Sequence, residues 1–203
     1  MSPKQASSFG RARPAQPAKP PKASAAVRVA AVQLASGPNV AANLNEAKRL
    51  IAMAVKQGAK LVALPEYFAI MGLQDTDKVK VREEEGRGPI QQFLSDTAKK
   101  HKIWIVGGSA PLVSKDPNRV RNSSLVYNDK GKLVARYDKI HLFGLDLGNE
   151  HYREEKTITP GDTVTVVDTP FGRIGLSVCY DLRFPELYRA MGMVDLKIGR
   201  AHV

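Results

Sequence analysis

The chain has 203 residues, of which 43% are hydrophobic and 25% charged, a composition typical of a globular protein with one sizeable core. It contains no apolar run of about 18 residues, so no transmembrane helix and no membrane partner are expected. Its one cysteine, Cys179, excludes a fold built on internal disulfides and suits a reducing compartment, so we expect a cytoplasmic protein.

The net charge of +11 would suit a nucleic-acid-binding protein, but the charge is unevenly distributed. No acidic residue precedes Glu46, so the basic residues of the first segment are unopposed. Aromatic residues make up 6% of the chain and do not alternate with basic ones. We therefore expect no nucleic-acid partner.

Residues 1–25 are rich in proline, alanine, lysine and serine and have almost no large apolar residues. This composition predicts a disordered basic tail. An organellar import signal is the alternative, since the segment is basic and free of acid. Its prolines disfavour the amphipathic helix that such a signal requires, and a solubilising tail is the simpler interpretation.

The first half of the remaining chain alternates between strand and helix patterns. Short apolar runs predict buried strands, and apolar residues at helical spacing predict helices. The expected elements are a strand over 27–34, a helix over 42–57, a strand over 60–64, a helix over 89–100 and a strand over 103–107. Gly58 suits the left-handed residue after a helix, and Pro89 suits the first position of one.

The second half contains pairs of short strands. Residues 123–127 and 132–137 flank the turn sequence 128–131, and residues 163–168 and 173–179 flank 169–172. Such a chain predicts the α/β class, with helices covering mixed sheets.

A strand pattern leads directly into Cys179, which is followed by a polar turn and a helix start. This arrangement would expose a thiol beside backbone N–H groups that could lower its pKa and bind an oxyanion. On the residues alone, a single cysteine at the end of an apolar strand is more often a small buried hydrophobic residue.

Four segments, in order along the chain, resemble the motifs of the nitrilase (carbon–nitrogen hydrolase) superfamily. They are Leu64–Tyr67 (LPEY), Arg136–Phe143 (RYDKIHLF), Arg153–Asp162 (REEKTITPGD) and Cys179–Glu186 (CYDLRFPE). The similarity extends from about Val27 to Met191. It implies a nitrilase-like α-β-β-α sandwich with mixed sheets, incomplete at the C-terminus.

The resemblance also implies a Glu-Lys-Cys triad. Cys179 would be the nucleophile, Glu66 the general base, and Lys139 the cation that stabilises the tetrahedral intermediate. Glu154 would orient Lys139 or assist proton transfer. From the residues alone, an exposed strand-end acid is the simpler interpretation of Glu66, Lys139 could be a surface lysine, and Glu154 could be one member of an exposed charge cluster.

The implied mechanism proceeds through a thioester and requires no metal or organic cofactor. The four histidines, His101, His141, His151 and His202, have no close metal-ligand spacing with Cys179. His141 is expected to be a structural, hydrogen-bonding residue.

Within the superfamily, residues 140–143 and 156–162 most resemble the Nit branch, which implies a small carboxylate-bearing amide as substrate. An ω-amidase-like activity that releases ammonia is the expectation, and a deaminated-glutathione amidase or N-carbamoyl amide hydrolase is the alternative. Arg183 and Tyr180 are candidate substrate-binding residues. Arg183 could instead form an ion pair with Asp181 or Glu186. From another class, the chain could be an inactive fragment or a binding-only pseudoenzyme.

The expected domain organisation is a tail over 1–25, a partial hydrolase domain over 26–195, and a non-native terminus over 196–203. Residues 198–203 match the translation of a common sequencing adapter. We therefore expect the 203-residue chain to be inactive and its full-length parent to be an amidase. The resemblance also implies a homodimer or higher homo-oligomer for that parent.

Overall fold

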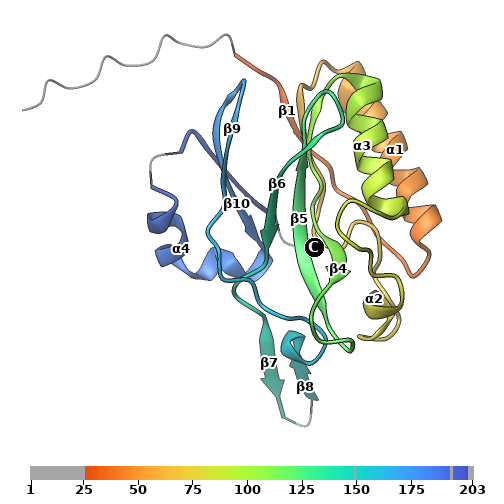
Figure 1. Cartoon of the computed structure of the whole chain (residues 1–203), viewed down its shortest axis with the longest axis vertical. Coiled ribbons are helices and arrows are strands. Elements are labelled where there is room, and N and C mark those ends of the chain that lie inside the picture. Colours follow the sequence, from red (N-terminus) through yellow and green to blue (C-terminus); the bar gives the residue numbers. More distant parts are fainter. Residues whose placement is uncertain (1–25, 149, 193, 201–203) are drawn as a thin grey trace, which may run out of the picture.

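The computed structural model describes residues 26–148, 150–192 and 194–200 in four layers. Two sheets face one another, α1 and α3 lie on the outer side of the larger sheet, and α4 lies on the far side of the smaller one (Figure 1). This order of layers confirms the expected α-β-β-α sandwich. The predicted tail, 1–25, lies outside the described residues, as do residues 201–203 of the predicted non-native terminus.

The larger sheet contains six strands and is mixed. Three neighbouring strands at one end of the sheet are parallel to one another. The next strand is antiparallel to them, and it also pairs antiparallel with two further strands, one on each of its edges. In spatial order the strands are β1 (Val29–Ala31), β2 (Leu61–Ala63), β3 (Trp104–Val106), β5 (Val120–Tyr127) and β4 (Ala110–Val113), with β6 (Leu133–Asp138) beside β5.

The smaller sheet has β10 (Gly172–Val178) at its centre, antiparallel to β9 (Val166–Thr169) and parallel to β11 (Leu196–Arg200). The strands β7 (Gly144–Leu147) and β8 (Glu150–Arg153) form a separate two-stranded unit that extends from the body of the molecule (Figure 1). Two short 3-10 helices cover Glu154–Lys156 and Cys179–Arg183.

The two long helices have the termini that their sequences predict. Helix α1 (Val40–Lys56) starts where the Asn39 side chain accepts a hydrogen bond from Ala42 N, and it ends before Gly58, whose φ is +87°. Helix α3 (Pro89–His101) has Pro89 at its first turn. Two short helices complete the set, α2 (Asp77–Lys80) and α4 (Pro185–Ala190).

Two apolar cores fill the spaces between the layers. Between the helices and the larger sheet, residues such as Ile51, Leu94 and Ile105 are fully buried. Between the two sheets, Tyr137 and Leu176 belong to a second core and are likewise fully buried. This second core fixes the larger sheet against β10, the strand that leads to Cys179.

The strand patterns are confirmed, but several strands are shorter than expected. The run 27–34 forms strand only over Val29–Ala31, where it pairs with β2. Both predicted hairpins are antiparallel pairs, and Asn128 Oδ1 closes the first turn by accepting from Lys130 N and Lys132 N, both at 3.0 Å. Four further elements had no sequence pattern that predicted them, namely β4, α2, the β7–β8 pair and β11.

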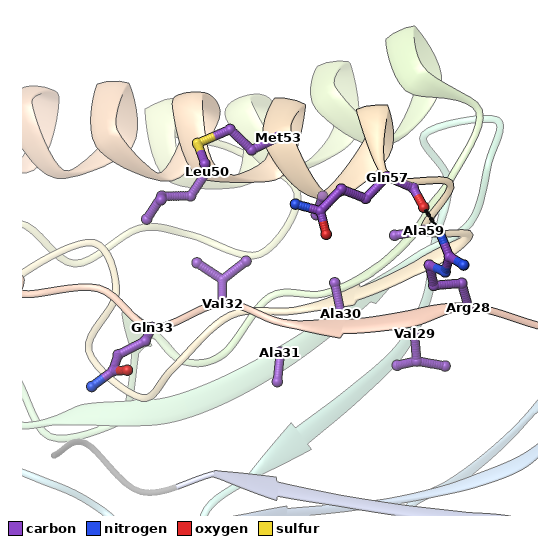
Figure 2. Close-up of a pocket in the computed structure, with 11 residues that line it drawn as sticks. Arg28, Val29, Ala30, Ala31, Val32, Gln33, Leu50, Met53, Gln57 and Ala59 are labelled. Atoms are coloured by element: carbon purple, nitrogen blue, oxygen red, sulfur yellow. Dashed lines mark hydrogen bonds between the residues drawn. The ribbon is translucent and has the colours of Figure 1, made fainter.

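The β1 side of the molecule contains a hollow of about 330 Å³ between this strand and α1 (Figure 2). Here the Arg28 guanidinium donates to the carbonyl of Gln57, which is the C-cap of α1. None of the candidate catalytic residues lines this hollow.

Among the described residues, the helices are too short or too polar to span a membrane.

Candidate active site

Three strand ends bring the predicted catalytic residues together. Glu66 lies shortly after β2, Lys139 directly after β6, and Cys179 directly after β10. Glu66 and Lys139 have 3% and 0% of their surface exposed, which excludes the alternative that either is a surface residue. Cys179 is half-buried, so its thiol is neither sealed in the core nor fully exposed.

Charged contacts join these residues. Lys139 Nζ lies 3.0 Å from Glu66 Oε1 and 2.8 Å from Glu154 Oε2. The Glu66 carboxylate lies near enough to the Cys179 thiol for each group to affect the pKa of the other, and it accepts a hydrogen bond from Asn122 Nδ2 at 2.8 Å. The site therefore brings together one thiol, one ammonium and two carboxylates.

Burial and charge together set the protonation of the cluster. Burial raises the pKa of the Cys179 thiol, the Glu66 carboxylate raises it further, and Lys139 lowers it, leaving a pKa of about 12. Burial also raises the pKa of Glu66 above its ordinary value, against the opposing effect of Lys139. Burial would lower the pKa of Lys139, but Glu66 and Glu154 outweigh it and raise that pKa above the ordinary value. At neutral pH the thiol is therefore protonated and the lysine charged.

The backbone is strained at two positions in this site. Tyr67, next to Glu66, and Cys179 have φ values of +53° and +51°, a left-handed conformation that non-glycine residues rarely adopt. The loop after β3 approaches the Glu66 segment so closely that a Cβ on Gly108 would lie 1.9 Å from Pro65 O. Tight packing thus maintains the strained conformations, which determine where the two side chains point.

Glu154 is held from three sides. Its Oε1 accepts from Tyr67 Oη and Lys139 Nζ, each at 3.0 Å, and its Oε2 accepts from Phe143 N at 2.7 Å. Glu154 is buried, whereas the adjacent Glu155 is exposed. The structure therefore places Glu154, and not its neighbour, in the cluster.

The two candidate substrate-binding residues are placed differently. Tyr180 is half-buried and lies edge-on to Phe143 and Phe184, with ring centroids 5.3 and 5.4 Å away. Arg183 is exposed and forms no ion pair with any residue that the structure describes. The ion pairs considered from the sequence are absent, because Glu186 pairs with Arg189 and Asp181 binds other donors.

His141 has a structural environment, as expected. Its Nδ1 lies 2.7 Å from Asp181 Oδ1, and its ring stacks on Phe184 with centroids 3.6 Å apart and planes 8° apart. This histidine therefore joins the segment that follows Lys139 to the turn that follows Cys179.

Sequence reasoning did not identify several residues of the site. Tyr67, Asn122 and Asp181 gave no local signal, because each acts through partners far away in the sequence. Lys78 was also missed. It is half-buried and donates to Thr157 Oγ1 at 3.2 Å. Together with Tyr67 and Tyr152, it lines a cavity of about 50 Å³.

The curated proteins that are similar to this chain include amidases. The chain is 41% identical over 166 residues to the deaminated glutathione amidase of Yersinia enterocolitica, covering 80% of this chain and 57% of that protein. It is 38% identical over 169 residues to the omega-amidase NIT3 of Saccharomyces cerevisiae, covering 79% and 57%. The chain thus spans little more than half the length of these relatives.

Solved structures show the same fold. The NitFhit protein of C. elegans superposes with a TM-score of 0.77 at 31% identity, covering 85% of this chain and 43% of that chain. Nit3 of Saccharomyces cerevisiae, a member of branch 10 of the nitrilase superfamily, superposes with a TM-score of 0.73 at 34% identity, covering 86% and 64%. The sequence model of the carbon–nitrogen hydrolase family matches residues 28–198, and the chain therefore belongs to this family, the nitrilase superfamily, with relatives of the Nit type.

Proposed function

We propose that the protein hydrolyses a small carboxylate-bearing amide, with Cys179 as nucleophile and ammonia as the leaving group. The observation that carries this proposal is the Lys139–Glu66–Glu154 ion-pair cluster with the Cys179 thiol beside Glu66. A nucleophile within hydrogen-bond reach of a base that is itself oriented by a third group is the arrangement that covalent hydrolysis requires.

In the first stage, Glu66 accepts the thiol proton while Cys179 Sγ attacks the amide carbonyl. A new C–S bond forms, the carbonyl oxygen becomes an oxyanion, and the proton passes from Glu66 to the leaving nitrogen as the C–N bond breaks. In the second stage, Glu66 removes a proton from water, the resulting hydroxide attacks the thioester, and the thiolate leaves. The thiol proton is then restored and the acid is released.

Lys139 and Glu154 support both stages. The Lys139 ammonium is the only cation in the described cluster, and it stabilises the oxyanion that forms beside Cys179. Glu154 holds Lys139 Nζ at 2.8 Å and is itself fixed by Tyr67 and Phe143. The ammonium therefore needs no reorganisation when charge develops on the substrate.

Two relatives support the substrate class, since they are named as a deaminated glutathione amidase and an omega-amidase. Lys78 supplies a cation beside the site for a substrate carboxylate, and its ammonium interacts electrostatically with Glu154 and Glu66. Tyr180 forms an aromatic wall with Phe143 next to the nucleophile. Arg183, further along the same turn, is exposed and available to an incoming anion.

The test is ammonia release from 2-oxoglutaramate by the full-length protein and by its Cys179→Ala variant, with the 203-residue chain assayed in parallel. We expect turnover by the full-length protein and a loss on the order of a thousandfold or more in the variant, because the nucleophile is removed. Deaminated glutathione and an N-carbamoyl amide, used as further substrates, separate the alternative amidase activities.

Substantial and equal rates in the two proteins would contradict the role of Cys179. A folded full-length protein that turns over none of the three substrates would favour the binding-only alternative.

A further inference from the structure

Asp181 is the most fully bonded carboxylate in the described part of the site, although it does not belong to the catalytic cluster. Its side chain is completely buried. Oδ1 accepts from His141 N at 3.0 Å and lies 2.7 Å from His141 Nδ1, while Oδ2 accepts from Tyr137 Oη at 2.6 Å and from Val178 N at 2.8 Å. Four donors thus converge on one buried acid.

These donors flank the catalytic residues. Tyr137 lies two residues before Lys139 and His141 two residues after it, and Val178 directly precedes Cys179. Asp181 itself lies two residues after the nucleophile. One carboxylate in the turn after the nucleophile therefore hydrogen bonds to residues on both sides of Lys139 and to the residue before Cys179. These bonds cross the interface between the two sheets.

A buried carboxylate is costly to maintain unless its environment satisfies it. Among the described residues, Asp181 has no lysine or arginine partner, and the imidazole of His141 is the only basic side chain beside it. Fixed hydrogen-bond donors replace a cation here, and two of them are backbone N–H groups whose direction cannot change. Such an arrangement specifies geometry more than it adds net attraction.

We propose that Asp181 is a positioning residue that sets the separation of the Lys139 ammonium and the Cys179 thiol. This inference rests on the proposed function of the site, since it assigns a role in that reaction. On the other side, Lys139 N donates to Asn122 O at 2.9 Å and Lys139 O accepts from Gly161 N at 2.8 Å, so the lysine backbone is held from both directions. The Asp181 hydrogen bonds do not reach the side chains of Glu66, Lys139 or Cys179, so Asp181 acts through its four donors.

Asp181→Asn is a selective test because of the backbone donors. Each carboxylate oxygen faces a backbone N–H, His141 N on one side and Val178 N on the other. An amide nitrogen placed at either position would point its own hydrogens at an N–H group. The variant must therefore lose one of these two backbone hydrogen bonds, while the size and shape of the side chain are conserved. Asp168→Asn, the same change at an exposed residue of β9, is the matched control.

Two measurements separate a positioning role from a general loss of stability. In the full-length protein, we expect Asp181→Asn to lower kcat on 2-oxoglutaramate by roughly ten- to a hundredfold, with KM within about twofold of the parent. The second measurement is the pH profile of Cys179 alkylation by iodoacetamide, which needs no substrate. As the thiol loses its alignment with Lys139, its alkylation profile should shift to higher pH, with slower alkylation at neutral pH, whereas Asp168→Asn should match the parent in both assays.

If Asp181→Asn fails to fold, Tyr137→Phe decides, because it removes the hydrogen bond to Asp181, together with a longer one from Ile140 N, and keeps the buried ring. We expect a smaller fall in kcat, about three- to tenfold, with slower alkylation, and no such change in Tyr127→Phe, a buried tyrosine on the neighbouring strand. A folded Asp181→Asn variant with the parent's kcat and alkylation profile would overturn the proposal. So would a Tyr137→Phe variant that loses stability alone.

Failure of the proposed function would look different. The parent would then show no turnover that depends on Cys179, while the alkylation profiles would still report whether Asp181 controls the thiol.

Discussion

The Glu66 carboxylate has two effects on Cys179 that act in opposite directions on reactivity. Burial raises the thiol pKa most, and the charge of Glu66 raises it further, to about 12. Glu66 is also the proposed acceptor of the thiol proton. The same side chain thus keeps the nucleophile protonated in the resting site and deprotonates it when an amide arrives.

Glu66→Gln should separate these two effects. Removing the negative charge lowers the thiol pKa, so a larger fraction is thiolate at neutral pH and alkylation by iodoacetamide should become faster there. Amide turnover should fall by about a hundredfold or more, because no base remains. The pH profiles of alkylation and of ammonia release, measured on the same preparations, test this divergence.

Glu85→Gln, which changes an exposed carboxylate paired with Arg136, is the control for Glu66→Gln and should leave both rates unchanged. Slower alkylation in Glu66→Gln would show that the carboxylate does not raise the thiol pKa.

At the scale of the elements, α3 owes its N-terminus to an acid outside the helix. The Glu83 carboxylate is buried and accepts from Ile90 N at 2.6 Å and from Gln91 N at 3.1 Å. Gly88, with φ of +129°, makes room for it, since a Cβ there would lie 2.2 Å from Glu83 Cδ. The first-turn N–H groups, which have no carbonyl acceptor within the helix, are satisfied in this way.

Glu83→Ala should therefore destabilise the protein by roughly 1–3 kcal/mol, because it leaves two buried backbone donors without an acceptor. The free energy of unfolding in urea measures this loss. Glu84→Ala, the same change at the exposed adjacent residue, should have little effect. Equal losses in the two variants would argue against the capping role of Glu83.

The elements that could be predicted are those whose signals are local. The α1 and α3 helices follow from apolar spacing together with Gly58 and Pro89, and the first hairpin follows from its Asn128 turn. By contrast, β4 contains Pro111 and lies at the end of its sheet, where proline is tolerated but weakens the strand pattern. The β7–β8 pair is short and largely exposed, including Leu145 and Leu147 of β7, so no buried apolar run marked it.

Only part of the site could be predicted from the residues. Alternation along β6 left the direction of Lys139 open, and the structure shows that it continues one residue past the strand, with Tyr137 and Lys139 both fully buried. The resemblance to the family supplied Glu66 and Glu154. No local pattern could reveal that Asp181 binds Tyr137 and His141, because those contacts exist only once the sheets have packed.

At the scale of the whole molecule, the core between the two sheets connects stability to the site. Leu176 is fully buried in that core and lies on β10, shortly before Cys179. Packing on this strand therefore holds the nucleophile against the sheet that carries Glu66 and Lys139.

Leu176→Ala should lower the free energy of unfolding by about 2–5 kcal/mol, since it removes buried methyl groups and leaves a cavity. Leu182→Ala, at a position 73% exposed just after the nucleophile, is the matched control and should cost far less. Urea denaturation of the two variants provides the comparison. Similar losses would mean that the interface between the sheets contributes little to the fold.

The proximity of Cys179 to Glu66 has a consequence for the electrical balance of the interior. A proton that passes from the thiol to the carboxylate turns a neutral thiol and an anionic acid into an anionic sulfur and a neutral acid, so their total charge is the same before and after. No new charge has to be created in a medium that solvates charge poorly. Nucleophile activation then requires no proton exchange with bulk water, and buffer concentration should not limit that step.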